Sequence, residues 1–162
     1  MNHKMTLSQA VCQHIDAWIT RYPQEQKRSG VFEALRIVQE ENGGHLTVPL
    51  MDAVADYLAL PKVAVYEVAT FYSMYHLKPV GKHIIYLCTN ISCMLNGAEK
   101  LTDYLKEKLH IELNETTADG KITLKEVECL GACVNAPVCQ IGKQYHEGLT
   151  KEKLDEIVDG LK

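Results

Sequence analysis

Apolar positions in the first half of the chain recur at steps of three and four residues, the period of amphipathic helices. They predict four short helices in residues 1–78, with no strand among them. The stripes are Leu7, Val11, Ile15, Trp18 and Ile19 in the first helix, Val31, Leu35 and Val38 in the second, Met51, Val54 and Leu58 in the third, and the segment 62–77 as the fourth. Gly43 and Gly44 are expected to end the second helix, and Thr47 to cap the third.

The pattern changes after Gly81. The run HIIYL at 83–87 predicts a buried strand, and residues 97–109 predict an amphipathic helix. A second strand over Ile122–Val127, a hairpin over 137–149 with its turn at Gly142 and Lys143, and a helix capped by Thr150 complete the order. This order predicts an α/β fold: a helical N-terminal domain in 1–80, then a thioredoxin-like domain in 81–162. The helix that a thioredoxin-like fold places between the second strand and the hairpin must be absent or reduced to a loop.

Composition limits the class of protein. The 162 residues are 46% hydrophobic and 23% charged, with a net charge of −4 and no concentrated positive charge, which argues against nucleic-acid binding. No apolar run approaches the roughly 20 residues of a membrane-spanning helix. The first 18 residues lack the apolar core of a signal peptide and the composition of a transit peptide. We therefore expect a cytoplasmic protein without membrane insertion.

Four of the six cysteines form two pairs, Cys88-x4-Cys93 and Cys129-x3-Cys133. Each pair follows a predicted strand, and Cys93 is expected to precede a helix that starts near Asn96. Sites in open α/β sheets lie beyond the carboxyl ends of strands, so the four thiols are predicted to converge there. Gly97 and Gly131 can let backbone N–H groups approach the sulfur atoms.

Three kinds of site fit four cysteines. A structural zinc site in a scaffold module is one, although its ligands are often only two residues apart. Disulfides are another, which a reducing compartment disfavours. The wide x4 and x3 loops favour a 2Fe–2S cluster held by four thiolates. The plant-type ferredoxin pattern is excluded, because Met-Leu-Asn occupies residues 94–96, where its third cysteine would fall.

The segments CTNISC with NG, ECLGACVNAPV and VYEVATFYSMY resemble the thioredoxin-like 2Fe–2S subunit of respiratory complex I, the NADH:quinone oxidoreductase. The resemblance covers roughly residues 8–160. It implies that Cys88, Cys93, Cys129 and Cys133 hold one 2Fe–2S cluster and that the chain transfers electrons within an oxidoreductase.

The resemblance also implies partners. These are a subunit that binds FMN and NADH and further iron–sulfur subunits of the peripheral arm, at the cytoplasmic face of the inner membrane. Related chains serve NAD-linked hydrogenases and formate dehydrogenases, so these parent complexes remain alternatives. The isolated chain could also form a homodimer. No dinucleotide-binding or hydrolase motif is present, so no catalytic residue is expected in this chain itself.

Other residues invite a second interpretation. Cys139 alternates with Ile141 in the hairpin, so we interpret it as a small core residue, with a substitute ligand as the alternative. Cys12 is interpreted as a packing residue of the first helix. Phe71, Tyr72 and Tyr75 are expected to lie in the core, with a partner interface as the alternative.

Overall fold

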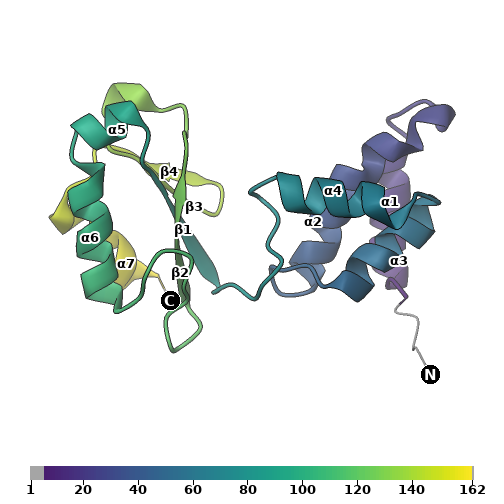
Figure 1. Ribbon diagram of the computed structural model, residues 1–162, viewed down its shortest axis with the longest axis horizontal. Coiled ribbons are helices and arrows are strands. Elements are labelled where there is room, and N and C mark those ends of the chain that lie inside the picture. The colour runs from purple at the N-terminus through teal and green to yellow at the C-terminus, as the bar shows by residue number, and fades with distance from the viewer. Residues whose placement is uncertain (1–5, 162) are drawn as a thin grey trace. The chain divides into compact units, whose positions relative to one another are not determined.

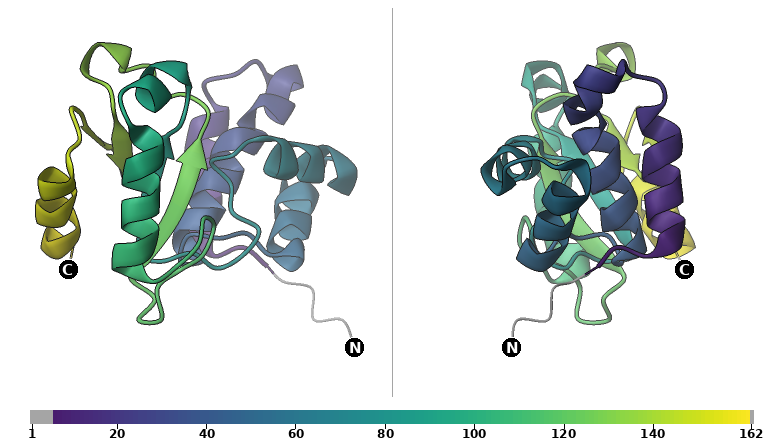
Figure 2. Two further views of the ribbon diagram at one scale, coloured as in Figure 1. Left: turned by 60° about the vertical axis from the view of Figure 1, so that its left-hand side comes forward. Right: turned by 90° about the vertical axis from the view of Figure 1, so that its right-hand side faces the viewer.

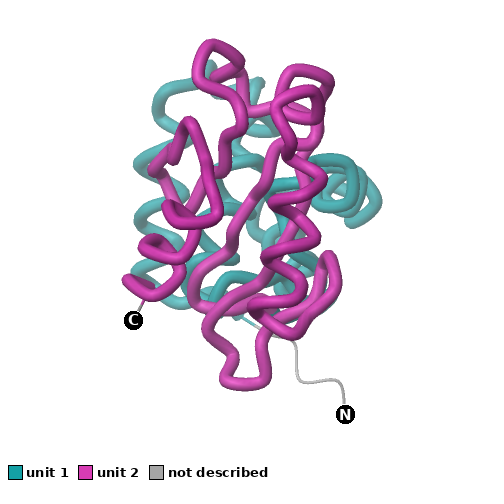
Figure 3. The backbone as a smooth tube through the Cα atoms, turned by 90° about the vertical axis from the view of Figure 1, so that its left-hand side faces the viewer, with its two compact units in different colours: residues 1–79 teal, residues 80–162 magenta. Residues whose placement is uncertain are grey.

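The computed structural model describes residues 6–161, so residues 1–5, where the N-terminal stretch considered above begins, and residue 162 lie outside the description. The chain divides into two compact units, Met1–Pro79 and Val80–Lys162 (Figure 3). The first unit is helical, and the second combines helices with a sheet (Figure 1). Each unit has a buried apolar core of its own. None of the helices in residues 6–161 is both long and apolar enough to cross a membrane.

Unit 1 contains the four helices that the apolar stripes predict. The elements described are α1 (Gln9–Ile19), the 3-10 helix η1 (Gln24–Gly30), α2 (Val31–Glu41), α3 (Val48–Leu58) and α4 (Lys62–Phe71). The Ser8 hydroxyl accepts a hydrogen bond from the N–H of Val11, and Thr47 caps α3 in the same way through Leu50. The predicted stripe residues Val11, Ile15, Leu35, Val38, Val54 and Leu58 are all in the core.

The fourth helix is shorter than the sequence pattern predicts, because α4 ends at Phe71 and Tyr72 has extended backbone angles. Consequently Phe71 is 81% exposed, and Tyr72 is also exposed, with its ring 4.8 Å from that of Phe32. The expectation that these residues belong to the core was wrong for Phe71 and Tyr72, since the helical periodicity on which it relied stops there. Only Tyr75 of the three is buried.

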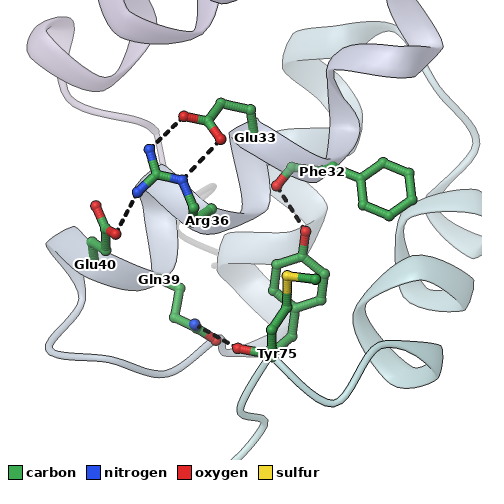
Figure 4. Close-up of polar contacts among 7 residues, drawn as sticks. Phe32, Glu33, Arg36, Gln39, Glu40 and Tyr75 are labelled. Carbon is green, nitrogen blue, oxygen red and sulfur yellow. Dashed lines mark hydrogen bonds and ion pairs between the residues drawn. The ribbon is translucent and has the colours of Figure 1, made fainter. Parts of the chain in front are cut away.

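The chain after α4 is tied back to α2 (Figure 4). The Gln39 amide donates to the carbonyl oxygen of Met74 over 3.1 Å and accepts from the N–H of His76 over 2.7 Å. The Tyr75 hydroxyl donates to the carbonyl oxygen of Phe32 over 2.8 Å. These bonds satisfy polar groups that would otherwise be buried without partners, so they fix a non-helical course for the segment.

Arg36 on α2 bonds to carboxylates one turn away on each side (Figure 4). Its guanidinium contacts Glu33 and Glu40, and the bond from Nε to Glu33 is 2.8 Å long. Ion pairs at these spacings support a helix, but their partial exposure limits the contribution to a few tenths of a kcal/mol, about 0.3–0.5 for each pair.

Alkaline pH is expected to weaken unit 1 through Tyr75. Burial raises the pKa of Tyr75 from 10.0 to about 12. The folded state therefore keeps this proton when the unfolded chain has lost it, so the stabilisation is complete below pH 10 and is lost as pH rises through about 12. Far-UV circular dichroism across this range should show helix loss that is less dependent on pH in Tyr75→Phe. Equal pH dependence in the two proteins would contradict this assignment.

Unit 2 is built on a four-stranded sheet in the order β2-β1-β3-β4. Its elements are β1 (His83–Cys88), α5 (Ile91–Leu95), α6 (Ala98–Leu109), β2 (Ile122–Val127), the 3-10 turn η2 (Cys133–Asn135), β3 (Cys139–Ile141), β4 (Gln144–His146) and α7 (Lys151–Gly160). Strands β1 and β2 are parallel, while β3 and β4 form an antiparallel hairpin beside β1. The predicted hairpin turn at Gly142 and Lys143 is confirmed, as is the α/β class. The helix in doubt is reduced to η2.

One face of the sheet carries the core of unit 2. Alternate strand residues such as Ile85, Leu87 and Leu124 are fully buried there. Helices α6 and α7 cover this face (Figures 1 and 2), with Leu105 and Leu154 packed against the strand residues. The sheet is thereby held rigidly, which fixes the positions at which β1 and β2 end.

The first residues of unit 2 lie close against β2. The Gly81 N–H donates to the hydroxyl of Thr123 over 2.6 Å. A Cβ on Gly81 would lie 2.8 Å from the carbonyl carbon and oxygen of Lys121, so no larger residue fits without a backbone shift. This close approach holds the chain at the beginning of β1.

Candidate metal centre

The first pair of thiols lies at the carboxyl end of β1. Cys88 is the last residue of that strand, and its N–H donates to the carbonyl oxygen of Val138 over 3.1 Å. Cys93 precedes α6, which begins at Ala98, so the expectation that it lies before a helix starting near Asn96 is confirmed; Cys93 itself lies within an additional short helix, α5. The Asn90 side chain accepts from the N–H of Ile91 at the start of α5, a helix that the apolar pattern does not predict. The four intervening residues are thus partly helical.

The second pair follows β2. That strand ends at Val127, Cys129 comes two residues later, and Cys133 begins η2. Cys88 and Val127 are register partners in the parallel pair of strands, so the two thiol pairs leave the sheet at the same end. Figures 1 and 2 show α5 and η2 side by side beyond this end of the sheet. The structure therefore brings the two loops together.

The two pairs differ in burial. Cys88 and Cys93 are each 2% exposed, whereas Cys129 and Cys133 are exposed. The buried thiols form a small apolar cluster with Ala98 and Val138, and further partly buried residues pack against it: Val127, Leu130, Ala132 and Ala136. The sequence analysis did not predict that these partly buried residues pack against the buried thiol pair. Their only signal was their position within or directly beside the second cysteine motif.

Burial raises the pKa of Cys93 to about 11, and a hydrogen bond with Cys88 adds to the rise. A backbone hydrogen bond with Val138 opposes it. The proximity of Cys133 contributes a smaller rise to the pKa of Cys93. Because a metal binds the thiolate, Cys93 would have to release its proton to serve as a ligand.

The two glycines chosen from the sequence differ in what their N–H groups contact. Gly131 donates to the sulfur of Cys129 over 3.3 Å, with φ of +73°. The Gly97 N–H donates instead to the carbonyl oxygen of Met94 over 2.9 Å, and its φ of +90° permits the turn from α5 into α6. A contact of Gly97 with the metal centre stays a prediction.

The two remaining cysteines lie apart from the site. Cys139 is fully buried in the unit 2 core, opposite Leu87 in the sheet register, which confirms its interpretation as a core residue. Cys12 is half-buried on α1 in unit 1.

Thiol reactivity should report this arrangement. The Cys139 thiol is inaccessible, and burial raises its pKa to about 12, while the thiolate is the reactive form. Brief treatment of the metal-free chain with N-ethylmaleimide at about pH 8, close to the range where thiols ionise, should modify Cys129 and Cys133 first. Peptide mass spectrometry should find Cys139 unmodified. Equal labelling of Cys139 and Cys129 would show that the core placement is incorrect.

Comparison with known proteins identifies the class to which this fold and site belong. Residues 15–162 match the family described as thioredoxin-like 2Fe-2S ferredoxin, and the chain belongs to that family. An NADH-quinone oxidoreductase subunit of Rickettsia conorii, the one designated E, is 49% identical over 143 residues, which are 88% of this chain and 86% of the relative. The subunit designated E 2 in Rhizobium meliloti is 45% identical over 150 residues, 93% of this chain and 88% of the relative.

A solved structure gives the same fold. A chain of an NAD+-reducing NiFe-hydrogenase in its H2-reduced state aligns with 78% of this chain at a TM-score of 0.68 and 18% identity. This chain spans 22% of that hydrogenase chain, so the likeness concerns the fold alone. Together the comparisons confirm the thioredoxin-like fold, the resemblance to the 2Fe–2S subunit of NADH:quinone oxidoreductase, the oxidoreductase assignment and one 2Fe–2S cluster as the cofactor.

The residues at this end of the sheet fit such a cluster. Among residues 6–161, no three His, Cys, Asp or Glu side chains gather closely enough to hold a single metal ion. A 2Fe–2S cluster requires thiolates over a wider span, with two at each iron. Two thiol pairs on adjacent loops, one buried and one exposed, fit that requirement, and the Gly131 N–H contacts the sulfur of Cys129.

Proposed function

We propose that Cys88, Cys93, Cys129 and Cys133 hold the 2Fe–2S cluster and that the chain passes single electrons within an NADH:quinone oxidoreductase. The observation that supports this most is the convergence of two cysteine pairs after adjacent parallel strands. The conversion of the two-electron chemistry of NADH and flavin into one-electron steps is the chemistry that such a cluster supplies when bound.

The chain's own residues set the conditions for this transfer. Strand β1 fixes Cys88 through its bonds to neighbouring strands, and α5 holds Cys93 in an apolar cluster. Burial disfavours added negative charge, whereas the N–H of Gly131 favours it. The reduction potential is set by the balance of these two effects. The units Met1–Pro79 and Val80–Lys162 act as separate domains, and only the second carries the site.

The partner at the cysteine end is the subunit that binds FMN and NADH. Large apolar side chains lie exposed on the same two loops as the thiols: Ile91 and Leu95 on α5, and Val134, 96% exposed, on η2. An exposed apolar surface with few charges is typical of the centre of a protein interface. A partner seated there would also exclude water from Cys129 and Cys133.

The exposed aromatic residues of unit 1 support a second contact in the same assembly. Phe71 and Tyr72 stack edge to face with centroids 5.0 Å apart, and Met74 beside them is exposed. Aromatic residues and methionine are enriched where partners bind. The remaining iron–sulfur subunits of the peripheral arm are the partners for this surface, and the whole assembly lies at the cytoplasmic face of the membrane.

A hydrogenase or formate dehydrogenase is the alternative parent complex. The hydrogenase structure shares the fold at only 18% identity, whereas the Rickettsia and Rhizobium relatives are 49% and 45% identical. This difference favours the quinone-reducing complex. Purification of the tagged chain from its own cells decides between them, because quinone-reducing and NiFe or molybdenum subunits differ in mass and metal content.

Spectroscopy of the purified chain tests the site. A chain prepared without oxygen should be reddish-brown, contain iron and sulfide in equal amounts, and give an electron paramagnetic resonance signal after dithionite reduction. A colourless chain that contains zinc would replace this proposal with the structural zinc scaffold. Size-exclusion chromatography of the same sample shows whether the isolated chain is a homodimer.

A further inference from the structure

The loop between β2 and η2 covers the buried thiols. Leu130 and Ala132, which lie between the two exposed cysteines, pack against the cluster that contains Cys88 and Cys93. The segment that joins the exposed pair is therefore part of the apolar surroundings of the buried pair. An incoming 2Fe–2S cluster would meet the exposed thiols of Cys129 and Cys133 before it reached the buried thiols of Cys88 and Cys93.

The ends of this loop are held, while its middle is held only locally. At the start, the N–H of Thr89 donates to the carbonyl oxygen of Val127 over 3.2 Å. At the end, Asn135 accepts from the N–H of Gly148 over 2.6 Å, and its amide donates to Glu147 over 2.6 Å. In the middle, Gly131 bonds within the loop to Cys129. Movement of Leu130 and Ala132 would leave the bonds named at both ends of the loop intact.

We propose that this site is loaded in a fixed order: Cys129 and Cys133 capture the 2Fe–2S cluster first, and Cys88 and Cys93 bind it after Leu130 and Ala132 move aside. The inference rests on the proposed set of four ligands. Its basis is the difference in exposure between the pairs, together with the contacts of the loop that joins the exposed pair.

Each step is an exchange of thiolates without oxidation or reduction. The donor is a 2Fe–2S cluster held by four thiolates of a carrier, such as glutathione. Two cysteine thiols of the chain replace two carrier thiolates, and their two protons leave on the departing carrier thiols. The iron valences, the sulfides and the charge of the cluster do not change. The same exchange then occurs at the buried pair and releases the last two carrier thiols.

Matched double variants test the order. The metal-free chain is mixed without oxygen with glutathione-bound 2Fe–2S cluster, and capture is followed by visible circular dichroism and native mass spectrometry. Cys88→Ser/Cys93→Ser should capture at about the wild-type rate and stop at a species that retains two glutathiones. Cys129→Ser/Cys133→Ser should capture at least roughly tenfold more slowly. Equal capture rates for the two double variants would overturn the order.

The cover itself is tested with a pair of apolar variants. Leu130→Ala should speed the release of the last two glutathiones several-fold, because it removes contacts that hold the loop over the buried thiols. Val134→Ala is the control, since Val134 lies directly after the same cysteine motif but is 96% exposed. Equal acceleration in both, or none in Leu130→Ala, would overturn the role of the cover.

Failure of the order can be separated from failure of the site. If the wild-type chain captures the 2Fe–2S cluster and Cys129→Ser/Cys133→Ser captures it equally fast, only the proposed loading order is overturned. A wild-type chain that takes up no cluster loses the ligand assignment and the order with it. Far-UV circular dichroism of every variant confirms that the helices and sheet are formed before rates are compared.

Discussion

Replacing Cys129 with alanine is expected to remove most of the visible absorbance and bound iron of the purified chain. A 2Fe–2S cluster is held by four thiolates, and a missing one opens an iron to water. Cys88→Ala, which removes a buried thiol, should have the same effect. It also leaves a small cavity in the apolar group of residues that includes Ala98 and Val138. Absorbance spectra and iron analysis of samples prepared without oxygen measure the loss.

The two cysteines outside the site supply the controls. Cys12→Ala removes a thiol from unit 1, and Cys139→Ala removes one from the core of unit 2. Both should keep their colour, and Cys139→Ala should unfold more easily because its thiol is fully buried. Loss of colour in Cys139→Ala at a temperature where the chain is still folded would contradict the assignment of Cys129.

Replacing Leu124 with alanine is expected to cause a large loss of stability in unit 2. Leu124 is fully buried in β2, between the sheet and its covering helices, and such truncations cost about 2–5 kcal/mol. Since β2 leads directly to Cys129, the variant should also lose its cluster at lower denaturant concentration. Guanidinium titrations followed by circular dichroism and by visible absorbance measure both effects.

Leu35→Ala provides the matched comparison, because Leu35 is equally buried but lies in the core of unit 1. It should lower the stability of the helices by a similar amount and leave cluster retention unchanged. This outcome is expected because the two cores share no residue. If Leu35→Ala released the cluster as readily as Leu124→Ala, the units would not be independent.

Much of the fold could be predicted because the informative patterns are local. The run that contains Ile85 and Leu87 became the central strand, and Gly142 with Lys143 became the hairpin turn. Thr47 and Thr150 cap the helices that the sequence assigned to them. In each case short-range propensity and burial favour the same structure.

The errors arose where distant contacts override the local sequence pattern, or where a helix is too polar or too short to produce one. The apolar periodicity of the α4 sequence continues beyond Phe71. The hydrogen bonds of the Gln39 and Tyr75 side chains nevertheless hold the following segment in a non-helical conformation. The 3-10 helix η1 lies in a polar stretch with no apolar stripe to announce it. Helix α5 is only five residues long and depends on the Asn90 cap, a signal too short for a periodic pattern.

The candidate site shows the same division. The spacing of the four cysteines and the family resemblance predict them as the site, but their unequal burial could not be predicted from the sequence. That difference depends on the packing of Leu130 and Ala132 against the apolar group that contains Cys88 and Cys93, and on the position of Val138 just before the neighbouring strand. Such contacts join segments far apart in the chain, so no window of sequence contains them.

The parallel pairing of β1 with β2 also has an evolutionary consequence. The thirty-five residues between Cys93 and Cys129 include α6 and a return loop, 110–121, that turns at the opposite end of the sheet (Figure 1). Insertions in this loop would lengthen the interval without moving a thiol. Natural selection can therefore vary that interval more readily than the x4 and x3 spacings, which are set within single loops. Searches for distant relatives should accordingly keep the spacing within each cysteine motif fixed and allow the interval between the two motifs to vary in length.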